Sequence, residues 1–275
     1  MTANVRQLDV SEAKKFLDET RLNARTLLDV RQDFEYAEGH LPGSTWIPLP
    51  ELSERLGELD RALPVLAYCH SGKRSLAAAN LLVGQGFQDV MALQGGIAAW
   101  DGAQAVGPLD MGLKVLLAAT TPDVLLERAW GMELALEGYY ADLAGTADEA
   151  EVIALFERLA GFEERHCRTL VEIWKRRGGT DVDAFEERAS ASVDPETLEG
   201  GISAADYLGM LDDPANTAEA LDLAMAIEAQ ALDLYLRRAK SETDPDLRRT
   251  LLLLSEEERA HLKLLGNFVS GRGRF

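Results

Sequence analysis

Short apolar runs alternate with helical stretches through the first part of the chain. Three of these runs are 26–30, 65–68 and 90–93, and the last two stand close to proline or glycine residues. Continuous apolar runs of this length are typical of strands buried on both faces of a parallel sheet. Apolar residues at helical spacing predict helices before the first run, over 11–17, and between the runs, over 52–56 and 75–85. Strands that alternate with helices indicate an α/β domain, a parallel sheet flanked by helices, over residues 1–107.

The second part of the chain carries helical periodicity alone. Four long stretches place apolar residues three or four apart: roughly 122–144, 148–177, 217–242 and 245–269. A long connection rich in Gly, Pro, Asp and Ser, residues 178–216, separates the second stretch from the third. Four helices with one long crossover predict an all-α four-helix bundle over residues 121–275. We expect residues 108–120 to be the linker between the two domains.

Charge and cysteine content exclude several classes of protein. The net charge of −19 argues against nucleic-acid binding, because phosphate recognition needs a basic face. The two cysteines, Cys69 and Cys167, are too few for a disulfide framework or a four-thiolate metal site. The sequence has no apolar run of about 18 residues and no signal-peptide pattern at its start. We therefore expect a soluble, cytoplasmic protein without a nucleic-acid or membrane partner.

One cysteine lies between a predicted strand and a predicted helix. Cys69 directly follows the apolar run 65–68, and the loop after it contains Gly72. A loop in this place turns backbone N–H groups inward beside a helix N-terminus, so it favours a thiolate and can hold an anion. Lys73 and Arg74 add positive charge at the rim. Such a thiolate can accept a sulfane sulfur and pass it on, whereas the alternative is a cysteine that is merely a small buried hydrophobic residue.

The residues around this loop resemble the rhodanese family of sulfurtransferases. The family's opening signature is matched by Asp29-Val30-Arg31, Glu35-Tyr36, Gly39-His40-Leu41-Pro42-Gly43-Ser44 and Ile47-Pro48-Leu49. Its active-site loop is matched by Cys-x4-Arg, and its closing signature by Gly86-Phe87, Leu93-Gln94-Gly95-Gly96 and Trp100. Together these motifs cover nearly all of residues 1–107.

This resemblance implies a rhodanese fold in which Cys69 is the nucleophile and becomes a persulfide. It implies a small-molecule sulfur donor and a thiol acceptor as partners. The substrate would be bound by the rest of the loop: His70, Ser71, Gly72, Lys73, Arg74 and Ser75. Asp29 and Arg31, together with His40, would brace the loop without reacting.

The length and composition of the loop refine the expected substrate. Four residues separate Cys69 from Arg74, whereas the related phosphatases have one more because phosphate is larger than a single sulfur. This favours sulfur transfer over dephosphorylation. Many family members have Arg after the cysteine, but this chain has His70, which carries less charge at neutral pH. We therefore expect the thiosulfate dianion to be a poorer donor than a persulfide or polysulfide.

An internal repeat runs through the helical part of the chain. A glutamate on one helix precedes a Glu-x-x-His on the next helix by thirty residues, and this happens twice. The residues are Glu133 with Glu163 and His166, then Glu228 with Glu258 and His261. Each first glutamate also has a tyrosine seven residues later, Tyr140 and Tyr235. Residues three apart lie on one face of a helix, so each Glu-x-x-His presents both side chains together.

The stripes that carry these groups are otherwise apolar. Glu228, for example, is flanked at helical spacing by Ala224, Leu232 and Tyr235. A single Glu-x-x-His is most simply a solvated helix surface, but two copies at equal spacing on apolar stripes are not. Four carboxylates in a bundle core would be very unfavourable unless paired or bound to cations. Two metal ions would supply that charge.

This arrangement resembles the rubrerythrin branch of the ferritin-like superfamily, whose di-iron or di-manganese sites have this ligand pattern. The resemblance implies six ligands: Glu133, Glu163, His166, Glu228, Glu258 and His261. It implies that Glu163 and Glu258 bridge two iron ions per chain; manganese or zinc would also fit, and no organic cofactor is expected. Tyr140 and Tyr235 are either hydrogen-bond donors to the ligands or packing residues.

Two departures from the family pattern bear on its chemistry. Rubrerythrins often have a further carboxylate one turn after the third helix's ligand, and here that position is Ala231. The chain has no four-cysteine rubredoxin module, so electrons must come from an external donor. Bundles of this superfamily commonly associate into oligomers, so the resemblance implies that the chain could form a homodimer.

The sequence therefore predicts a sulfurtransferase joined to a di-iron centre that reacts with peroxide or oxygen. Two alternatives stay open. The bundle could be a metal-binding or dimerisation module without turnover, or its metal site could oxidise the sulfur species that Cys69 produces.

Overall fold

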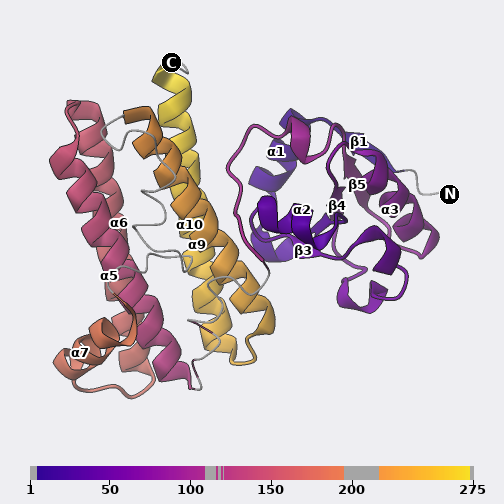
Figure 1. The fold of residues 1–275 in the computed structure, drawn as a ribbon. Helices are drawn as coiled ribbons and strands as arrows, with labels where there is room; N and C mark the ends of the chain where they lie inside the picture. Colours follow the sequence, from indigo (N-terminus) through magenta and orange to yellow (C-terminus); the bar gives the residue numbers. More distant parts are fainter. Residues whose placement is uncertain (1–4, 109–115, 117–118, 120, 195–216, 273–275) are drawn as a thin grey trace. The chain divides into compact units, whose positions relative to one another are not determined.

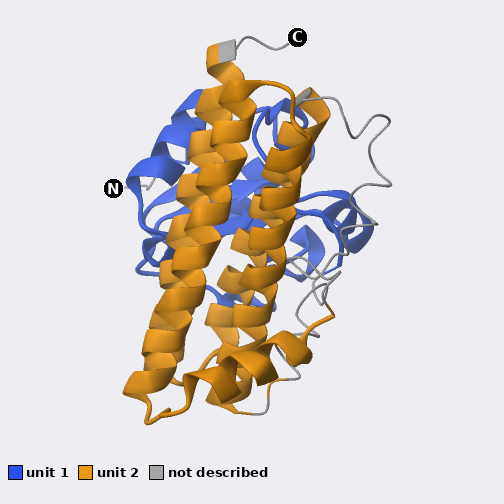
Figure 2. Ribbon diagram, turned by 90° about the vertical axis from the view of Figure 1, so that its left-hand side faces the viewer, with its two compact units in different colours: residues 1–109 blue, residues 110–275 orange. Residues whose placement is uncertain are grey.

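The chain forms two compact units, Met1–Leu109 and Asp110–Phe275 (Figure 2). The computed structural model describes residues 5–108, 116, 119, 121–194 and 217–272. Most of the predicted linker 108–120, and residues 195–216 of the predicted crossover, lie outside the described residues.

A five-stranded, all-parallel sheet forms the centre of the first unit, in the order β1-β5-β4-β2-β3 (Figure 1). The strands are β1 (Arg6–Leu8), β2 (Thr26–Asp29), β3 (Thr45–Trp46), β4 (Val65–Tyr68) and β5 (Val90–Leu93). The three predicted runs are confirmed as β2, β4 and β5, and all their residues are buried. The sequence did not reveal β1 and β3, because these edge strands are short and only partly buried.

Helices cover both faces of this sheet. Successive strand residues point to opposite faces, so β4 sends Leu66 and Tyr68 into one core cluster and Ala67 into the other. Helix α1 (Val10–Glu19) packs its apolar residues against the first cluster, and α3 (Lys73–Gly84) packs against the second. The predicted helices over 11–17 and 75–85 are thereby confirmed, with small shifts at their ends.

The predicted helix over 52–56 is wrong. The segment has two short 3-10 turns, Leu49–Glu51 and Leu56–Glu58, and between them only Leu52 is anchored in the core. One buried side chain cannot define a helical face. A helix that the sequence analysis missed, α2 (Asp33–Glu38), is six residues long and begins with a capping box between Gln32 and Glu35.

The second unit is the predicted helical bundle. Its long helices are α5 (Pro122–Thr146), α6 (Ala150–Arg176), α9 (Thr217–Ser241) and α10 (Pro245–Arg272). Helices α5 and α6 pack as one hairpin and α9 and α10 as the other, with the four helices side by side (Figure 1). All four lie within a few residues of their predicted ranges.

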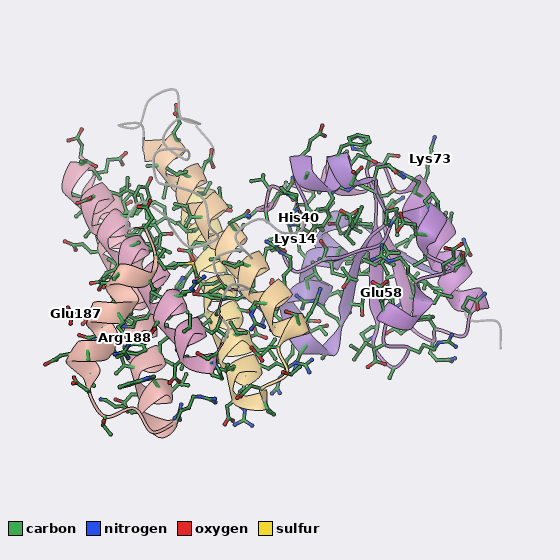
Figure 3. All side chains as sticks on the ribbon, turned by 60° about the horizontal axis from the view of Figure 1, so that its bottom comes forward. Lys14, His40, Glu58, Lys73, Glu187 and Arg188 are labelled. Atoms are coloured by element: carbon green, nitrogen blue, oxygen red, sulfur yellow. The ribbon has the colours of Figure 1, made fainter. Side chains whose placement is uncertain are left out.

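The crossover contains a helix that was not predicted, α7 (Val182–Ser192), which packs on α5. Its Phe185 is fully buried, with its ring centroid 6.3 Å from that of Trp130 and 4.8 Å from that of Trp174. Arg188, which is labelled in Figure 3, pairs with Glu127 of α5 at 2.7 Å. A side chain at Gly131 would place its Cβ 2.7 Å from the carbonyl oxygen of Ala189, so glycine permits this close contact just before Glu133.

Within the described part of the chain, no helix has both the length and the apolar character needed to cross a membrane.

Candidate active sites: a cysteine loop and a buried carboxylate cluster

Cys69 lies at the carboxyl edge of the parallel sheet, immediately after β4. Its neighbour in the sheet is β2, and Asp29 at the end of β2 stands in register with Tyr68. Ligands of parallel α/β sheets bind at this edge, where the strand ends meet the loops. The Cys69 residue is 1% exposed, so its sulfur is reached through the loop.

Hydrogen-bond donors surround the sulfur atom. The backbone N–H of Gly72 donates to Cys69 Sγ at 3.2 Å, and α3 begins at the next residue. Burial by itself raises the pKa of the Cys69 thiol. The backbone N–H and hydroxyl of Ser75, with the N–H groups of Ser71 and Gly72, outweigh burial and lower that pKa below its ordinary value. The loop therefore stabilises a thiolate.

Glycines that follow β5 hold this loop in place. Ile97 and Ala98 donate their N–H groups to the carbonyl oxygens of Cys69 and His70 at 2.8 and 3.0 Å. Gly96 has a φ of 62°, and a Cβ there would lie 2.3 Å from the Cys69 carbonyl oxygen. Gly72 has a φ of 90°. Both positions require glycine because the loop backbone must approach the β5 turn closely.

The rim of the loop carries less free positive charge than the sequence implies. Arg74 makes two 2.6 Å hydrogen bonds to the Glu35 carboxylate on α2, and this contact lowers the pKa of Glu35 to about 2. His70 and Lys73 are exposed, and Lys73 projects away from the start of α3 (Figure 3). The sequence pattern does not predict this pairing of Glu35 with Arg74.

Asp29 and Arg31 form a buried brace beside the loop. The Asp29 carboxylate accepts hydrogen bonds from the Arg31 guanidinium at 2.6–3.0 Å, and Arg31 Nη2 also donates to the Gly39 carbonyl oxygen at 2.7 Å. His40 is also buried, with its ring stacked on Tyr36 at 3.7 Å. These contacts join the ends of β2 and α2, as bracing residues would.

The bundle brings together all six residues that the repeat singled out. The four glutamates are fully buried, and the two histidines are 1% and 4% exposed: Glu133 on α5, Glu163 and His166 on α6, Glu228 on α9, Glu258 and His261 on α10. Their ligand-type atoms form two groups of four, within each of which the atoms lie within 4.8 Å of one another. One group contains Glu133 and His166, the other contains Glu228 and His261, and both contain Glu163 and Glu258.

Each histidine turns Nδ1 towards this cluster. His166 Nδ1 lies 3.0 Å from Glu133 and 2.9 Å from Glu163. His261 Nδ1 lies 3.0 Å from Glu228 and 3.1 Å from Glu258. The two halves of the cluster therefore have matching geometry, as the matching spacings indicated.

The two tyrosines cross between the halves. Tyr235 on α9 donates its hydroxyl proton to Glu133 of α5 at 2.5 Å, and Tyr140 on α5 donates to Glu228 of α9. Both tyrosines are fully buried, and burial raises the pKa of Tyr140 well above its usual range. Each hydroxyl orients one terminal carboxylate and leaves its other oxygen facing the cluster.

The central carboxylates have no such donors. Among the described residues, no hydrogen bond of normal geometry reaches either oxygen of Glu163 or of Glu258, although all four atoms are buried. Burial raises the pKa of Glu163 to about 8 and that of Glu258 well above its usual range. Buried polar atoms without partners are rare in folded proteins. Two cations between these carboxylates would satisfy them, so the residues present fit a dinuclear metal centre.

Two further residues, Cys167 and Glu257, lie near the cluster. Cys167 is 7% exposed and belongs to the apolar core of the bundle, and burial raises the pKa of its thiol, as expected for a packing residue. Glu257, half-exposed on α10, lies 2.6 Å from His166 Nε2. The repeat does not single out Glu257, although its position directly before a Glu-x-x-His is a usable signal.

Comparison with known proteins agrees with this division into two sites. The family model of the Rhodanese-like domain matches residues 9–103, and that of Rubrerythrin matches residues 125–269. The chain therefore belongs to the rubrerythrin family and carries a rhodanese-like sulfurtransferase domain before its bundle. It combines a sulfurtransferase domain with a rubrerythrin-type metal module.

The relatives found by sequence resemble part of the chain. The thiosulfate sulfurtransferase GlpE of Pseudoalteromonas translucida is 30% identical over 98 residues, which are 36% of this chain and 90% of that protein. The putative sulfur carrier protein YrkF of Bacillus subtilis is 41% identical over 76 residues, which are 28% of this chain and 41% of that protein. The crystal structure of a rhodanese-related protein from Thermoplasma volcanium shares 32% identity with a TM-score of 0.31, covering 34% of this chain and 89% of that chain.

Proposed function

We propose that this protein transfers sulfane sulfur through a persulfide on Cys69 and reduces peroxide or oxygen at a di-iron centre in its bundle. The observation that supports the first activity is the sulfur atom of Cys69 inside a ring of N–H donors at the start of α3. The observation that supports the second is the pair of ligand groups that share Glu163 and Glu258.

Sulfur transfer proceeds in two displacements at Cys69. The thiolate attacks the outer sulfur of the donor, and the bond between the donor's two sulfurs breaks. The electron pair leaves with sulfite if the donor is thiosulfate, or with a thiolate if it is a persulfide. An acceptor thiolate then attacks the outer sulfur of the Cys69 persulfide and restores the Cys69 thiolate.

The loop supports both displacements by holding negative charge on sulfur. The N–H groups of Ser71, Gly72 and Ser75 face the sulfur and lower the pKa of Cys69, which favours the thiolate. The same donors can bind the outer sulfur of the persulfide. Because Arg74 is paired with Glu35, a donor with little negative charge suits this site better than the thiosulfate dianion.

In the bundle, we propose that Glu133 and His166 hold one iron and that Glu228 and His261 hold the other, with Glu163 and Glu258 shared. When bound, two ferrous ions would supply the two electrons that, with two protons, reduce hydrogen peroxide to two molecules of water, and an external donor would replace these electrons. Tyr140 and Tyr235 hold the terminal carboxylates in orientation through their hydroxyl groups. The apolar surroundings exclude water from the carboxylates.

The sulfur-transfer proposal is tested with Cys69→Ala. With thiosulfate or a persulfide as donor and cyanide as acceptor, we expect the variant to release no thiocyanate above background. Cys167→Ala is the matched control and should retain full activity, because that thiol is buried in the bundle core. Thiocyanate release by Cys69→Ala would show that another group accepts the sulfur.

The metal proposal is tested by metal analysis and by iron oxidation. Purified protein reconstituted anaerobically should hold about two ferrous ions per chain, and Glu228→Ala should lower this content. Hydrogen peroxide should oxidise the bound iron rapidly, and a reductant should then sustain turnover. Bound iron that peroxide leaves unchanged would indicate a metal-binding module without turnover.

A further inference from the structure

The two halves of the metal cluster differ in the residue that directly precedes each Glu-x-x-His. Adding 95 to a residue number of the first hairpin gives its counterpart in the second, as for Glu133 and Glu228 or for His166 and His261. By the same rule, the counterpart of Phe162 is Glu257. The residue directly before the Glu-x-x-His is therefore aromatic in one half and acidic in the other.

The acidic member of this pair contacts the histidine of the opposite half. Glu257 Oε2 lies 2.6 Å from His166 Nε2, while Nδ1 of the same ring faces Glu133 and Glu163. A neutral imidazole that donates its Nε2–H to a carboxylate keeps the lone pair of Nδ1 free for a metal ion. Such a contact fixes the ring and makes the ligand nitrogen more basic.

The aromatic member gives the other histidine a different environment. The Phe162 ring stacks on His261, with centroids 4.6 Å apart and planes 8° apart. The guanidinium of Arg165 lies 4.3 Å from the Phe162 centroid, and that of Arg158 lies 5.5 Å from it. Within the described residues, His261 meets carboxylates only through Nδ1: Glu163, Glu228 and Glu258.

These contacts place unlike charges behind the two metal positions. A carboxylate stands behind His166, whereas two guanidinium groups gather on the ring that covers His261. A cation is favoured beside the carboxylate and disfavoured beside the guanidinium groups.

We propose that the two metal positions are unequal, and that Glu257 and Phe162 make them so. The position next to Glu133 and His166 binds a divalent cation more tightly and fills first. The position next to Glu228 and His261 fills second. This inference rests on the metal centre proposed above, and Glu257 is a positioning residue that acts through His166. From the usual effect of such contacts, we expect the affinities to differ by about 10- to 100-fold.

The test uses metal-free full-length protein and cobalt, whose position is measured by anomalous diffraction. With one equivalent of Co²⁺, the anomalous peak beside Glu133 and His166 should be the stronger of the two. A titration in solution, followed through the cobalt absorption bands, should then give a tight step and a weaker one.

Variants distinguish the effect of the contact between Glu257 and His166 from the effect of removing one negative charge nearby. Glu257→Gln should weaken the tight step and bring the two anomalous peaks closer to equal height. Glu256→Gln is the matched control, because it removes one charge from the neighbouring residue, which pairs with Arg259 at 2.6 Å. Phe162→Glu should strengthen binding at the second position, and Phe162→Leu should not. Circular dichroism checks that each variant is folded.

Each outcome decides one part of the proposal. Peaks of equal height in the wild-type protein, or a stronger peak beside His261, would overturn the inequality. An unequal pair of peaks that survives in Glu257→Gln would overturn the role of Glu257. Absence of cobalt from the whole bundle would instead contradict the metal centre on which the inference rests.

Discussion

The cysteine loop and the carboxylate cluster both bury negative charge, but they balance it by opposite means. Around Cys69 the backbone supplies the donors, since the N–H groups of Ser71, Gly72 and Ser75 face the sulfur. In the bundle, helical hydrogen bonding already uses the backbone N–H groups, so none can turn towards Glu163 or Glu258. A loop can therefore stabilise an anion by itself, whereas a helix bundle needs cations from outside.

The largest effect is expected from removing a carboxylate that both metal positions share. Glu163→Ala should lower metal affinity at both positions by about 100-fold or more, because each ligand group uses Glu163. The same change should leave thiocyanate formation at Cys69 unaltered. Metal analysis and the sulfurtransferase assay on one preparation measure both effects.

Glu164→Ala is the matched control for this experiment, because the neighbouring glutamate is exposed. It should retain about two metal ions per chain. Loss of metal in the control alone, or in neither variant, would contradict the ligand assignment.

The next largest effect concerns the backbone that shapes the loop. Gly96→Ala should destabilise the rhodanese-like domain by about 3 kcal/mol, because the new Cβ would lie 2.3 Å from the Cys69 carbonyl oxygen at a φ of 62°. Thermal or urea unfolding measures this change. Gly84→Ala, where the Cβ meets nothing within 4 Å, should stay within about 1 kcal/mol of the wild type.

A smaller effect is expected from removing the Ser75 hydroxyl, which donates to the Gly72 carbonyl oxygen at 3.1 Å and lowers the pKa of Cys69. Ser75→Ala should raise the pKa of Cys69 towards its ordinary value, since the hydroxyl of Ser75 favours the thiolate. The thiolate fraction grows as pH rises through that pKa. The variant should therefore react about tenfold more slowly below the wild-type midpoint and equally fast above both midpoints.

Alkylation by iodoacetamide across a pH series, in a Cys167→Ala background, follows this reactivity. Ser71→Ala is the control, because Ser71 lowers the pKa of Cys69 through its backbone N–H. An unchanged midpoint in Ser75→Ala would assign the stabilisation of the thiolate to the backbone alone.

The smallest predicted effect concerns the choice of sulfur donor. His70→Arg adds an exposed positive charge at the loop and should raise kcat/KM for thiosulfate about fivefold. A neutral sulfane donor should respond less, because it carries no charge to attract. His70→Gln separates charge from size, and equal gains for both donors would contradict the electrostatic reading.

The spacing of apolar residues along the chain was sufficient to predict the helices and strands that bury many side chains. The runs that became β2, β4 and β5, and the four long helices, each bury a continuous face, so apolar spacing alone reveals them. The edge strands β1 and β3, the short helix α2 and helix α7 bury too few residues to leave such a pattern. Their formation depends on tertiary packing, for example that of Phe185 between Trp130 and Trp174.

In the candidate sites, too, contacts within one helix could be predicted from the sequence, whereas contacts between elements could not. Helical geometry requires Glu163 and His166 to share a face, so sequence spacing predicts that they lie together. Which residues meet across different helices depends on how the helices pack. The contacts of Glu257 with His166 and of Tyr235 with Glu133 are of this kind. The pairing of Glu35 with Arg74 likewise joins α2 to the cysteine loop across 39 positions of the chain.

The crossed tyrosines have a consequence for how the bundle can be divided. Tyr140 orients a carboxylate of the α9–α10 hairpin, and Tyr235 orients one of the α5–α6 hairpin. A peptide that comprised only one hairpin would carry a tyrosine without its carboxylate, three of the four residues of one ligand group and one of the four residues of the other. Two identical hairpins meeting about a twofold axis would restore every one of these contacts. The bundle therefore has the arrangement of a homodimer of hairpins within a single chain. Only a single chain allows the two hairpins to differ in sequence, as they do at Phe162 and Glu257.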